Sequence, residues 1–375
     1  MRQVSFLIKP ASSLCNLRCR YCFYADEAAK RNCADMGCMT EATAELLLRE
    51  AFALTAPPGA VHFLFQGGEP TLAGLGFFRF FVSRARALCP PGVKLSFSLQ
   101  TNATLLDEAW ARFLREERFL VGISLDGTAA IHNAHRVDAM GKGSWNRAKK
   151  GLELLLREKV SVNALCVVTG ICARSPQKVY QSLKALGFSH MQFIACLDPL
   201  DETPGSRPWS LRPDAYGSFL CRLFDLWYSD WQRGSYHSIR LFEDHVRLLL
   251  GEGSSTCATC GQCGGHLVVE GDGSVYPCDF YALDAWKMGV LGQQSLRDMI
   301  EGEVFRRFLL EGQRRPEACS ACGGQALCAG GCRRDRIRTA DGMHNIYCSA
   351  FRRLFDHAGP RLQQLAQAAQ SLRRP

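Results

Sequence analysis

The sequence has no long hydrophobic run. Its longest apolar stretches are short and interrupted by charged residues, and the first ten residues, MRQVSFLIKP, have neither the apolar core nor the small-residue cleavage site of a signal peptide. Low-complexity segments are also absent, as are internal repeats other than alternating strand and helix patterns. These absences exclude a membrane-spanning helix and a secretory signal, and they predict a cytoplasmic protein.

The composition is that of a globular protein. Of 375 residues, 47% are apolar and 22% are charged, which suits two or three domains with a sizeable core. The net charge of +9 comes mainly from arginine, with crowding that includes Arg314-Arg315 and Arg333 to Arg338. Because no recognised RNA-binding module accompanies the arginines, we interpret them as solvated faces and expect no nucleic-acid partner. The nineteen cysteines are unusual, and clustered cysteines in a cytosolic chain indicate metal or redox chemistry.

The first cysteine cluster is Cys15-x3-Cys19-x2-Cys22. Iron–sulfur cubanes normally have four cysteine ligands, so three thiolates leave one iron open to a small chelating ligand. A structural zinc site is the alternative, but such sites usually combine one C-x2-C pair with a second nearby pair. No second pair follows within roughly the next hundred residues. The spacing therefore favours an open iron–sulfur cluster.

Strand-like and helix-like segments alternate over the first half of the chain, which predicts an α/β fold with parallel strands. The apolar, strand-like runs are Val4–Lys9, Val61–Gln66, Lys94–Thr101, Leu120–Asp126, Val160–Val168 and His190–Cys196. The amphipathic segments between them are Thr40–Leu54, Gly76–Leu88, Asp107–Glu117, Trp145–Lys159 and Pro176–Leu186. Six such units suit an open, partial (β/α)6 barrel, whose chemistry collects at the carboxyl ends of the strands.

A proline-containing stretch, Leu197–Pro213, follows the sixth strand and indicates a linker. We expect three parts: a barrel at residues 1–210, a helical connector at residues 211–256, and a cysteine-rich region at residues 257–375. Aromatic residues recur at helical spacing within Tyr216–Trp231. They could line a peptide groove, but a core face is the more common meaning of such a stripe.

Polar groups follow several predicted strands. The second strand ends in Gln66-Gly67-Gly68-Glu69-Pro70, where glycines let a ligand approach the backbone, and the carbonyls and Glu69 can accept hydrogen bonds from an ammonium group. The third strand ends Gln100-Thr101-Asn102, and the fourth ends Ser124-Leu125-Asp126-Gly127, with Arg136 soon after. Since these strand ends share one edge of the barrel, we expect them to converge on one ligand.

The remaining clustered cysteines lie near the C-terminus. Cys257, Cys260 and Cys263 precede a predicted hairpin with a Gly271–Ser274 turn, and Cys278 follows it. After a stretch with a helical pattern, Leu296–Gly312, come Cys319-x2-Cys322-x5-Cys328-x3-Cys332 and then Cys348. Two zinc sites are one possibility for this region.

The N-terminal motif, followed by an aromatic residue, resembles the radical S-adenosylmethionine (radical SAM) superfamily. There, the amino and carboxylate groups of SAM bind the open iron, and the Gly-Gly-Glu-Pro element is similar to the one that holds the SAM amine. Arg136 would pair with the SAM carboxylate through a bidentate fork, although an exposed salt-bridge arginine is the alternative. The resemblance implies SAM contacts by Tyr21, Tyr24, Gly67, Gly68, Glu69, Ser124, Asp126, Arg136 and Leu197.

The C-terminal spacing resembles the SPASM domain, which carries two auxiliary [4Fe–4S] clusters. The resemblance implies that Cys257, Cys263, Cys278 and Cys332 ligate the first auxiliary cluster, and Cys319, Cys322, Cys328 and Cys348 the second. With the N-terminal cluster this makes three [4Fe–4S] clusters. Full ligation suits electron transfer or structure rather than substrate coordination. Cys260 has no place in this scheme.

Several segments look like the anaerobic sulfatase-maturating enzymes, among them LIKPASS at residues 7–13, QGGEPTLAG at residues 66–74 and GDGSVYPCDFY at residues 271–281. The resemblance implies anaerobic oxidation of a cysteine, with some activity on serine, to Cα-formylglycine. Its partners would be an unfolded sulfatase precursor, or its Cys/Ser-x-Pro-x-Arg segment, and a low-potential electron donor such as flavodoxin or ferredoxin.

The chemistry of that oxidation points to Asp279, next to Cys278. Forming an aldehyde removes a hydrogen atom, a proton and an electron. The radical derived from SAM takes the hydrogen atom, Asp279 is the matching proton acceptor in the resemblance, and an auxiliary cluster takes the electron. A hairpin-end aspartate bonded to its local backbone is the alternative for Asp279.

Two other functions stay open. One is another SPASM enzyme that modifies a ribosomal peptide, for example by thioether crosslinking. Such enzymes often carry an additional N-terminal leader-recognition domain, and the cysteine motif here already begins at Cys15. The other is a non-catalytic iron–sulfur electron carrier, which would not need an open iron or SAM-binding strand ends.

Overall fold

The six strand-like runs form strands in the computed structural model, which describes residues 1–371. Observed strand bounds differ from the expected ones by two residues or fewer, because apolar runs that end in polar or glycine residues mark their own limits. The strands are β1 (Gln3–Ile8), β2 (Gly59–Phe65), β3 (Val93–Thr101), β4 (Leu120–Ser124), β5 (Ser161–Val168) and β6 (His190–Ala195).

The chain divides into two units. The first comprises Met1–Ser124, Asn133–Asn163 and Gly264–Leu309, and the second comprises Leu125–His132, Ala164–Cys263 and the chain from Leu310 onward. Each unit therefore contains both barrel strands and C-terminal cysteines. The predicted boundaries at residues 210 and 256 are not tested by this division and stay predictions.

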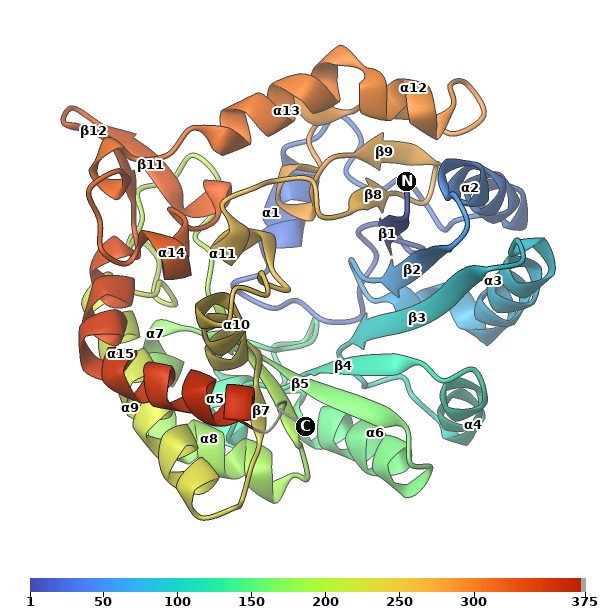
Figure 1. Ribbon diagram of the computed structural model, residues 1–375. Coiled ribbons are helices and arrows are strands. Elements are labelled where there is room, and N and C mark those ends of the chain that lie inside the picture. The colour runs from blue at the N-terminus through green and yellow to red at the C-terminus, as the bar shows by residue number, and fades with distance from the viewer. Residues whose placement is uncertain (372–375) are drawn as a thin grey trace. The chain divides into compact units, whose positions relative to one another are not determined.

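In the first unit, the strand order is β10-β9-β8-β1-β2-β3-β4 (Figure 1). Strand β8 pairs with β1 in parallel, and β1 to β4 are also parallel, whereas β8, β9 and β10 form antiparallel pairs. The additional strands are β8 (Leu267–Val269), β9 (Ser274–Tyr276) and β10 (Gly289–Val290). The predicted hairpin is thus present, and it extends the same sheet beside β1.

Side-chain caps mark the start of some helices of the first unit. Thr40 accepts a hydrogen bond from the Thr43 N–H at the start of α2, and Asp107 caps α4 through the Trp110 N–H. The helices are α1 (Phe23–Ala29), α2 (Glu41–Leu54), α3 (Gly74–Leu88), α4 (Glu108–Glu116), α6 (Trp145–Arg157) and α12 (Leu296–Glu301), with 3-10 turns η1 (Pro70–Ala73), η2 (Asp279–Tyr281) and η3 (Asp284–Trp286).

A phenylalanine cluster fills the core of the first unit. Phe63 of β2 packs against Phe6 of β1 and Phe81 of α3, with ring centroids 5.7 and 5.2 Å apart. Phe65 contacts Phe78 of α3 at 4.7 Å. Phe63 and Phe65 both face this core because residues two apart on a strand lie on the same face of the sheet. The core therefore holds the carboxyl ends of β1, β2 and β3 in fixed register.

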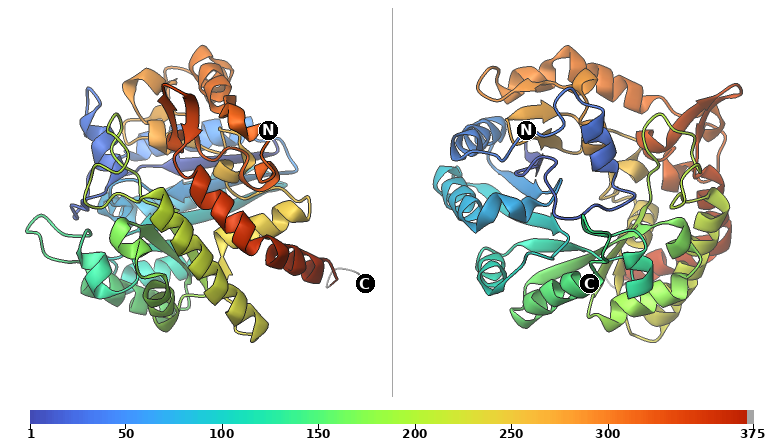
Figure 2. Two further views of the ribbon diagram at one scale, coloured as in Figure 1. Left: turned by 90° about the vertical axis from the view of Figure 1, so that its left-hand side faces the viewer. Right: turned by 180° about the vertical axis from the view of Figure 1, so that it is seen from behind.

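In the second unit, β5, β6 and β7 (Ser238–Ile239) pair in parallel, while β11 (Arg336–Thr339) and β12 (Gly342–Asn345) form a hairpin. Its helices are α5 (Ala129–Asn133), α7 (Gly170–Ala173), α8 (Pro176–Ala185), α9 (Pro213–Gln232), α10 (Arg240–Leu249), α11 (Cys257–Cys260), α14 (Gln325–Cys328) and α15 (Cys348–Ser371), with 3-10 turns η4 (Glu317–Cys319) and η5 (Arg333–Asp335). The long helices α9 and α15 lie side by side (Figure 2).

The aromatic stripe on α9 is a core face. Phe219, Phe224, Trp227 and Tyr228 are all buried, and the Phe224 ring packs on Tyr228 and on Phe242 of α10. The core interpretation of this stripe is therefore confirmed.

One predicted helix is wrong in its extent. The stretch Leu296–Gly312 was expected to be a single helix, but it forms α12 and α13 (Glu303–Gln313), with a break at Gly302. Gly302 adopts extended backbone, with φ of −73° and ψ of 165°, a conformation that is open to any residue and that interrupts the helical hydrogen bonds. Among residues 1–371, no helix is both long enough and apolar enough to cross a membrane.

Candidate active site

The three N-terminal cysteines share the loop that follows β1. Backbone turns fold this loop: the Ser12 N–H donates to the Lys9 carbonyl at 3.0 Å, and the Cys22 N–H donates to the Cys19 carbonyl at 3.1 Å. Burial raises the pKa of Cys15 to about 12, and the charges of Glu69, Cys19 and Cys22 add to the increase. The three cysteines thus lie on one short loop at the end of the first strand.

The donor set of this loop fits an iron–sulfur cluster. Thiolates are the ligands that such clusters use, and three of them leave one iron free for a chelating ligand. Within residues 1–371, no group of three or more His, Cys, Asp or Glu side chains is gathered tightly enough to hold a single metal ion. The assignment of an iron–sulfur cluster to these cysteines therefore rests on the chemistry of their thiolates and on their place in one loop.

The backbone around the glycine pair after β2 contacts the cysteine loop. Gly67 and Gly68 have φ of 101° and 52°, values that favour glycine. A Cβ at Gly68 would lie 2.2 Å from the Leu14 carbonyl oxygen and 2.7 Å from that of Ser12. The Glu69 N–H also donates to the Leu14 carbonyl at 2.8 Å. The backbone of the glycine pair thus touches the residues that lead into Cys15.

Glu69 is buried and braces two strand ends. Its carboxylate accepts hydrogen bonds from the Thr71 N–H and hydroxyl, from the Thr101 hydroxyl at 2.7 Å, and from the Asn102 N–H at 2.8 Å. Burial raises the pKa of Glu69 and these hydrogen bonds oppose that change, with a net increase. Four donors occupy the carboxylate, and its hydrogen bond with the SAM amine stays a prediction.

The end of β3 also reaches the cysteine loop. The Asn102 side-chain amide donates to Asn16 Oδ1 at 2.9 Å and lies 4.0 Å from the Cys15 sulfur. The Asn16 amide in turn donates to the Thr104 hydroxyl at 2.7 Å. Strand ends β1, β2 and β3 therefore converge on Cys15, as expected from a parallel sheet.

Tyr21 and Arg136, far apart in sequence, lie together. The Arg136 guanidinium is 5.3 Å from the centroid of the Tyr21 ring, and both side chains are buried. Backbone pairing places them there, because the Arg20 N–H donates to the His135 carbonyl at 2.9 Å. Burial argues against the alternative of an exposed salt-bridge arginine. The role of both residues toward SAM remains a prediction.

Tyr24 belongs to a buried group of charges that was not anticipated from the sequence. Its hydroxyl donates to Glu270 Oε1 at 2.5 Å, and Arg31 pairs with the same oxygen at 2.7 Å. Lys9 Nζ lies 3.2 Å from the centroid of the Tyr24 ring. Burial and the Glu270 charge raise the pKa of Tyr24, so the phenol stays neutral. The only sequence signal for this buried group was Lys9, a lysine directly after an apolar strand. The SAM contact of Tyr24 stays a prediction.

Asp279 lies at the start of η2, buried and in contact with three polar side chains. Gln66 Nε2 donates to its Oδ2 at 3.3 Å, His266 Nε2 lies 3.5 Å from Oδ1, and the Cys278 sulfur is 3.8 Å from Oδ1. Burial would raise the pKa of Asp279, but His266 and Lys9 outweigh it and the net change is downward. Asp279 is therefore an ionised carboxylate, the form that can accept a proton. His266 was missed in the sequence because a lone histidine carries no motif.

The last three predicted SAM contacts are Ser124, Asp126 and Leu197. Ser124 ends β4 and is half-buried. Asp126 is buried, and its Oδ1 accepts a hydrogen bond from the Val167 N–H at 2.9 Å. Leu197 follows β6 and is half-buried. Nothing in the structure tests their contact with SAM.

The C-terminal cysteines form two groups in the second unit. One group is Cys319, Cys322, Cys328 and Cys348. Burial raises the pKa of Cys319 and of Cys328, and the neighbouring thiols of this group add to both increases. These are the four cysteines of the predicted second set, and their ligation of a cluster stays a prediction.

Burial raises the pKa of Cys332, and Asp335, Cys257 and Cys263 add to the increase. Cys257, Cys263 and Cys332 all belong to the second unit and to the first predicted set, whose shared cluster stays a prediction. Cys278, the fourth, belongs to the first unit, and its ligand role stays a prediction. Cys260 is exposed, and its thiol donates to the Ser254 carbonyl at 3.7 Å.

Comparison with known proteins identifies two domains. The radical SAM superfamily model matches residues 10–183, and the model of the SPASM iron–sulfur cluster-binding domain matches residues 256–323. A cysteine-type anaerobic sulfatase-maturating enzyme of Clostridium perfringens strain 13 is 42% identical over 368 residues, which cover 98% of this chain and 99% of the relative. The chain belongs to the anaerobic sulfatase-maturating enzymes.

Other members of the family agree with this assignment. A serine-type enzyme of Klebsiella aerogenes is 33% identical, with 87% of this chain and 78% of the relative covered. The structure of native anSMEcpe with bound AdoMet superposes with a TM-score of 0.92 at 42% identity and covers 97% of this chain and 99% of that one. The expected fold, a partial (β/α)6 radical SAM barrel followed by a SPASM domain, is confirmed. As a radical SAM enzyme of this family, the chain uses SAM and iron–sulfur clusters.

Proposed function

We propose that the chain oxidises one cysteine of a sulfatase precursor, without oxygen, to Cα-formylglycine. Two observations support this substrate. Cysteine-type enzymes are its relatives over nearly the full length, and the structure of the relative anSMEcpe with bound AdoMet and the Cp18Cys peptide superposes with a TM-score of 0.92. We further propose that the target is an unfolded segment of the type Cys-x-Pro-x-Arg, with the serine version as a slower substrate.

The observation that carries the proposal is Asp279. Oxidation of a thiol to the aldehyde level removes a hydrogen atom from Cβ, a proton from sulfur, and an electron. When bound, SAM and the N-terminal cluster supply the radical that takes the hydrogen atom. The carboxylate of Asp279 takes the proton. Its lowered pKa keeps it ionised, the form that can accept a proton, and does not make it a stronger base.

Neighbouring side chains keep Asp279 in place for that role. Gln66 donates to one carboxylate oxygen and His266 lies beside the other. Gln66 directly precedes the glycine pair, so the same backbone positions both the proton acceptor and the cysteine loop. This arrangement serves an oxidation that needs both parts at once and has no use in a passive electron carrier.

We also propose the three clusters and their ligands. Cys15, Cys19 and Cys22 hold the open cluster. Cys257, Cys263, Cys278 and Cys332 hold the first auxiliary cluster, and Cys319, Cys322, Cys328 and Cys348 the second, with a flavodoxin or ferredoxin as the low-potential donor. The residues Tyr21, Tyr24, Gly67, Gly68, Glu69, Ser124, Asp126, Arg136 and Leu197 line the SAM site in this proposal.

The test uses the full-length protein, reconstituted anaerobically and supplied with SAM and dithionite. Peptides that carry Cys-x-Pro-x-Arg and Ser-x-Pro-x-Arg are followed by mass spectrometry, each beside a matched peptide with alanine at the target. We expect aldehyde from the cysteine peptide, less from the serine peptide, and none from alanine. If 5′-deoxyadenosine forms while the cysteine and serine peptides stay unchanged, the chain modifies another peptide and the proposal fails.

A further inference from the structure

The second cysteine group lies at the surface of its unit. Cys348 is exposed at the first position of α15, and Cys319, Cys322 and Cys328 are only partly covered. In the proposed function these four thiolates hold a fully ligated cluster, which can exchange electrons but cannot bind substrate. A redox cluster close to the surface is accessible to a partner protein.

Arginines surround this cysteine group. Arg336 Nε donates to the Gly330 carbonyl at 3.3 Å, and Gly330 adjoins Cys319. A Cβ on Gly330 would lie 3.5 Å from the Arg315 side chain and 3.6 Å from the Cys319 sulfur, so these two side chains flank one glycine. The Arg336 guanidinium is fixed by the carbonyls of Gly312 and Arg314, at 2.8 and 2.5 Å. The local backbone thus holds positive charge beside the cysteines.

Three further arginines extend this charge. Arg314 precedes Arg315, Arg338 lies two residues along β11 from Arg336 and so on the same face of the strand, and Arg352 lies one helical turn after Cys348. All three are exposed, and in the described part of the chain none of their side chains makes an ion pair. The exposed carboxylates in the same segments are fewer, namely Glu317, Asp341 and Asp356. The face therefore carries net positive charge that its own residues leave uncompensated.

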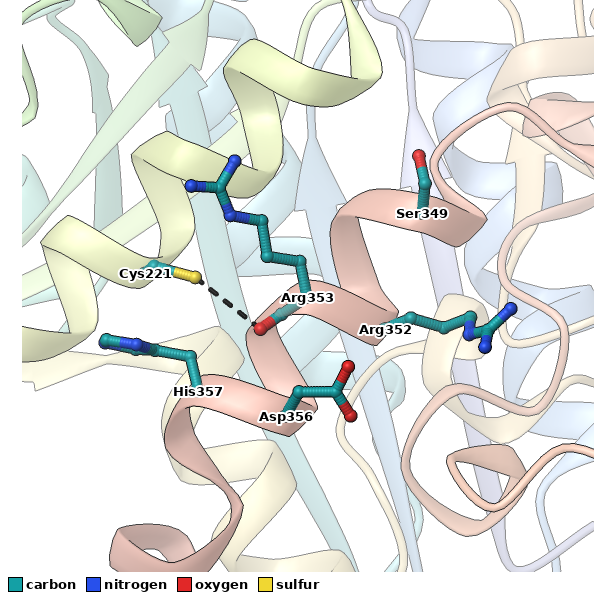
Figure 3. Close-up of a pocket in the computed structure, with 6 residues that line it drawn as sticks. All are labelled: Cys221, Ser349, Arg352, Arg353, Asp356 and His357. Atoms are coloured by element: carbon teal, nitrogen blue, oxygen red, sulfur yellow. Dashed lines mark hydrogen bonds between the residues drawn. The ribbon is translucent and has the colours of Figure 1, made fainter.

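A shallow hollow of about 620 Å³ lies along α15, where its lining begins at Ser349, the residue after Cys348 (Figure 3). Its lining comes from α15 and, through Cys221, from α9. Arg353 extends toward α9, where it donates to the Ser218 hydroxyl at 2.8 Å, whereas Arg352 extends away from α9 and stays open to solvent. His357 is held by Asp225 at 2.7 Å. The hollow can accept a carboxylate side chain from outside, with Arg352 as its partner.

We propose that Arg314, Arg315, Arg336, Arg338 and Arg352, here called the arginine rim, dock an acidic one-electron carrier protein against the second cysteine group. The inference rests on the proposed function, because it takes these cysteines as cluster ligands. When these cysteines hold a cluster, it would supply one electron to the oxidised flavin or iron–sulfur group of the docked carrier, and no bond would form or break. The carrier held by the rim would thereby take up the electron that substrate oxidation releases.

Side chains in these segments favour a protein over a nucleic acid. Single-stranded nucleic acids bind through exposed aromatic rings on which bases stack. Phe351 and Phe355 of α15, the aromatic residues nearest to Arg352 in sequence, stack on each other and are half-buried. Charge with no stacking platform suits the carboxylates of an acidic protein, which steer it by long-range attraction.

The test measures binding of a purified flavodoxin to the reconstituted full-length protein by fluorescence anisotropy, without peptide or SAM. In the charge-reversed variant R314E/R338E/R352E, which leaves the two arginines nearest the cysteines intact, we expect the Kd to rise about tenfold or more. Its dependence on salt should also flatten, because exposed charges dominate the interaction. The matched control R79E/R112E/R174E changes three other exposed arginines and should bind as the parent does.

Several outcomes would overturn the proposal. They are an unchanged Kd in the rim variant, an equal loss in the control, or an RNA oligonucleotide that binds the parent as tightly as flavodoxin. Should the triple variant lose iron, Arg352→Glu alone carries the test. Dithionite-driven aldehyde formation should be unaltered in the rim variant, so a failure of the rim is distinguishable from a failure of the proposed function.

Discussion

Asp279→Asn abolishes aldehyde formation while SAM cleavage continues. Asparagine has the shape of aspartate but cannot accept a proton, so the substrate thiol keeps its proton and the oxidation stalls after hydrogen abstraction. General-base contributions are typically about 10²- to 10⁴-fold, and we expect a loss of that size in aldehyde yield per 5′-deoxyadenosine formed. The ratio of the two products, measured by mass spectrometry and chromatography, reports this effect directly.

The matched control for this substitution is Asp284→Asn. Asp284 lies five residues further on, is exposed, and accepts a hydrogen bond from the Asn32 N–H at 2.8 Å. Its variant should form aldehyde at the rate of the parent. Iron content must be equal in the two variants, because Asp279 adjoins Cys278. An Asp279→Asn protein with full iron and normal aldehyde yield would show that another group takes the proton.

Gly68→Ala removes the N-terminal cluster. Its added Cβ would lie 2.2 Å from the Leu14 carbonyl oxygen, and alanine at φ of 52° is strained by about 1 kcal/mol. The loop that leads into Cys15 must therefore shift. We expect about a third of the iron to be lost, corresponding to one of three clusters, and SAM cleavage to disappear.

Gly76→Ala provides the comparison for Gly68→Ala. Gly76 lies in α3, and a Cβ there would meet no atom within 4 Å. Alanine in a helix interior is more favourable than glycine by about 0.5–1 kcal/mol, so this variant should be at least as stable and fully active. Equal iron content in the two variants would contradict the role given to the glycine pair.

The strands and helices of the barrel were readable from the sequence because local signals agreed. Apolar runs such as Val61–Gln66 ended in glycine or polar residues, and Thr40 and Asp107 stood where α2 and α4 begin. The broken helix at Gly302 was missed because a single glycine is tolerated in many helices, and only packing decides whether the chain bends there. Local pattern thus predicted elements, but not every interruption.

The candidate site was predictable where spacing carried the chemistry. The cysteine loop and the glycine pair were recognisable because their residues are close in sequence. The group formed by Tyr24, Arg31 and Glu270 was not, because its members come from segments more than two hundred residues apart. Glu69 was predicted to contact SAM, and the sequence did not show that its carboxylate also accepts hydrogen bonds from Thr101 and Asn102. Such roles depend on which strand ends meet, and the sequence does not state this.

The most direct test of the central claim uses a Cys-x-Pro-x-Arg peptide deuterated at the cysteine Cβ. Incubated anaerobically with the reconstituted protein, SAM and dithionite, it should yield formylglycine peptide and 5′-deoxyadenosine that carries one deuterium, in equal amounts. This result would place the hydrogen abstraction at Cβ of the residue that becomes the aldehyde. Aldehyde without deuterium in 5′-deoxyadenosine, or deuterated 5′-deoxyadenosine with no aldehyde from the parent protein, would contradict the account.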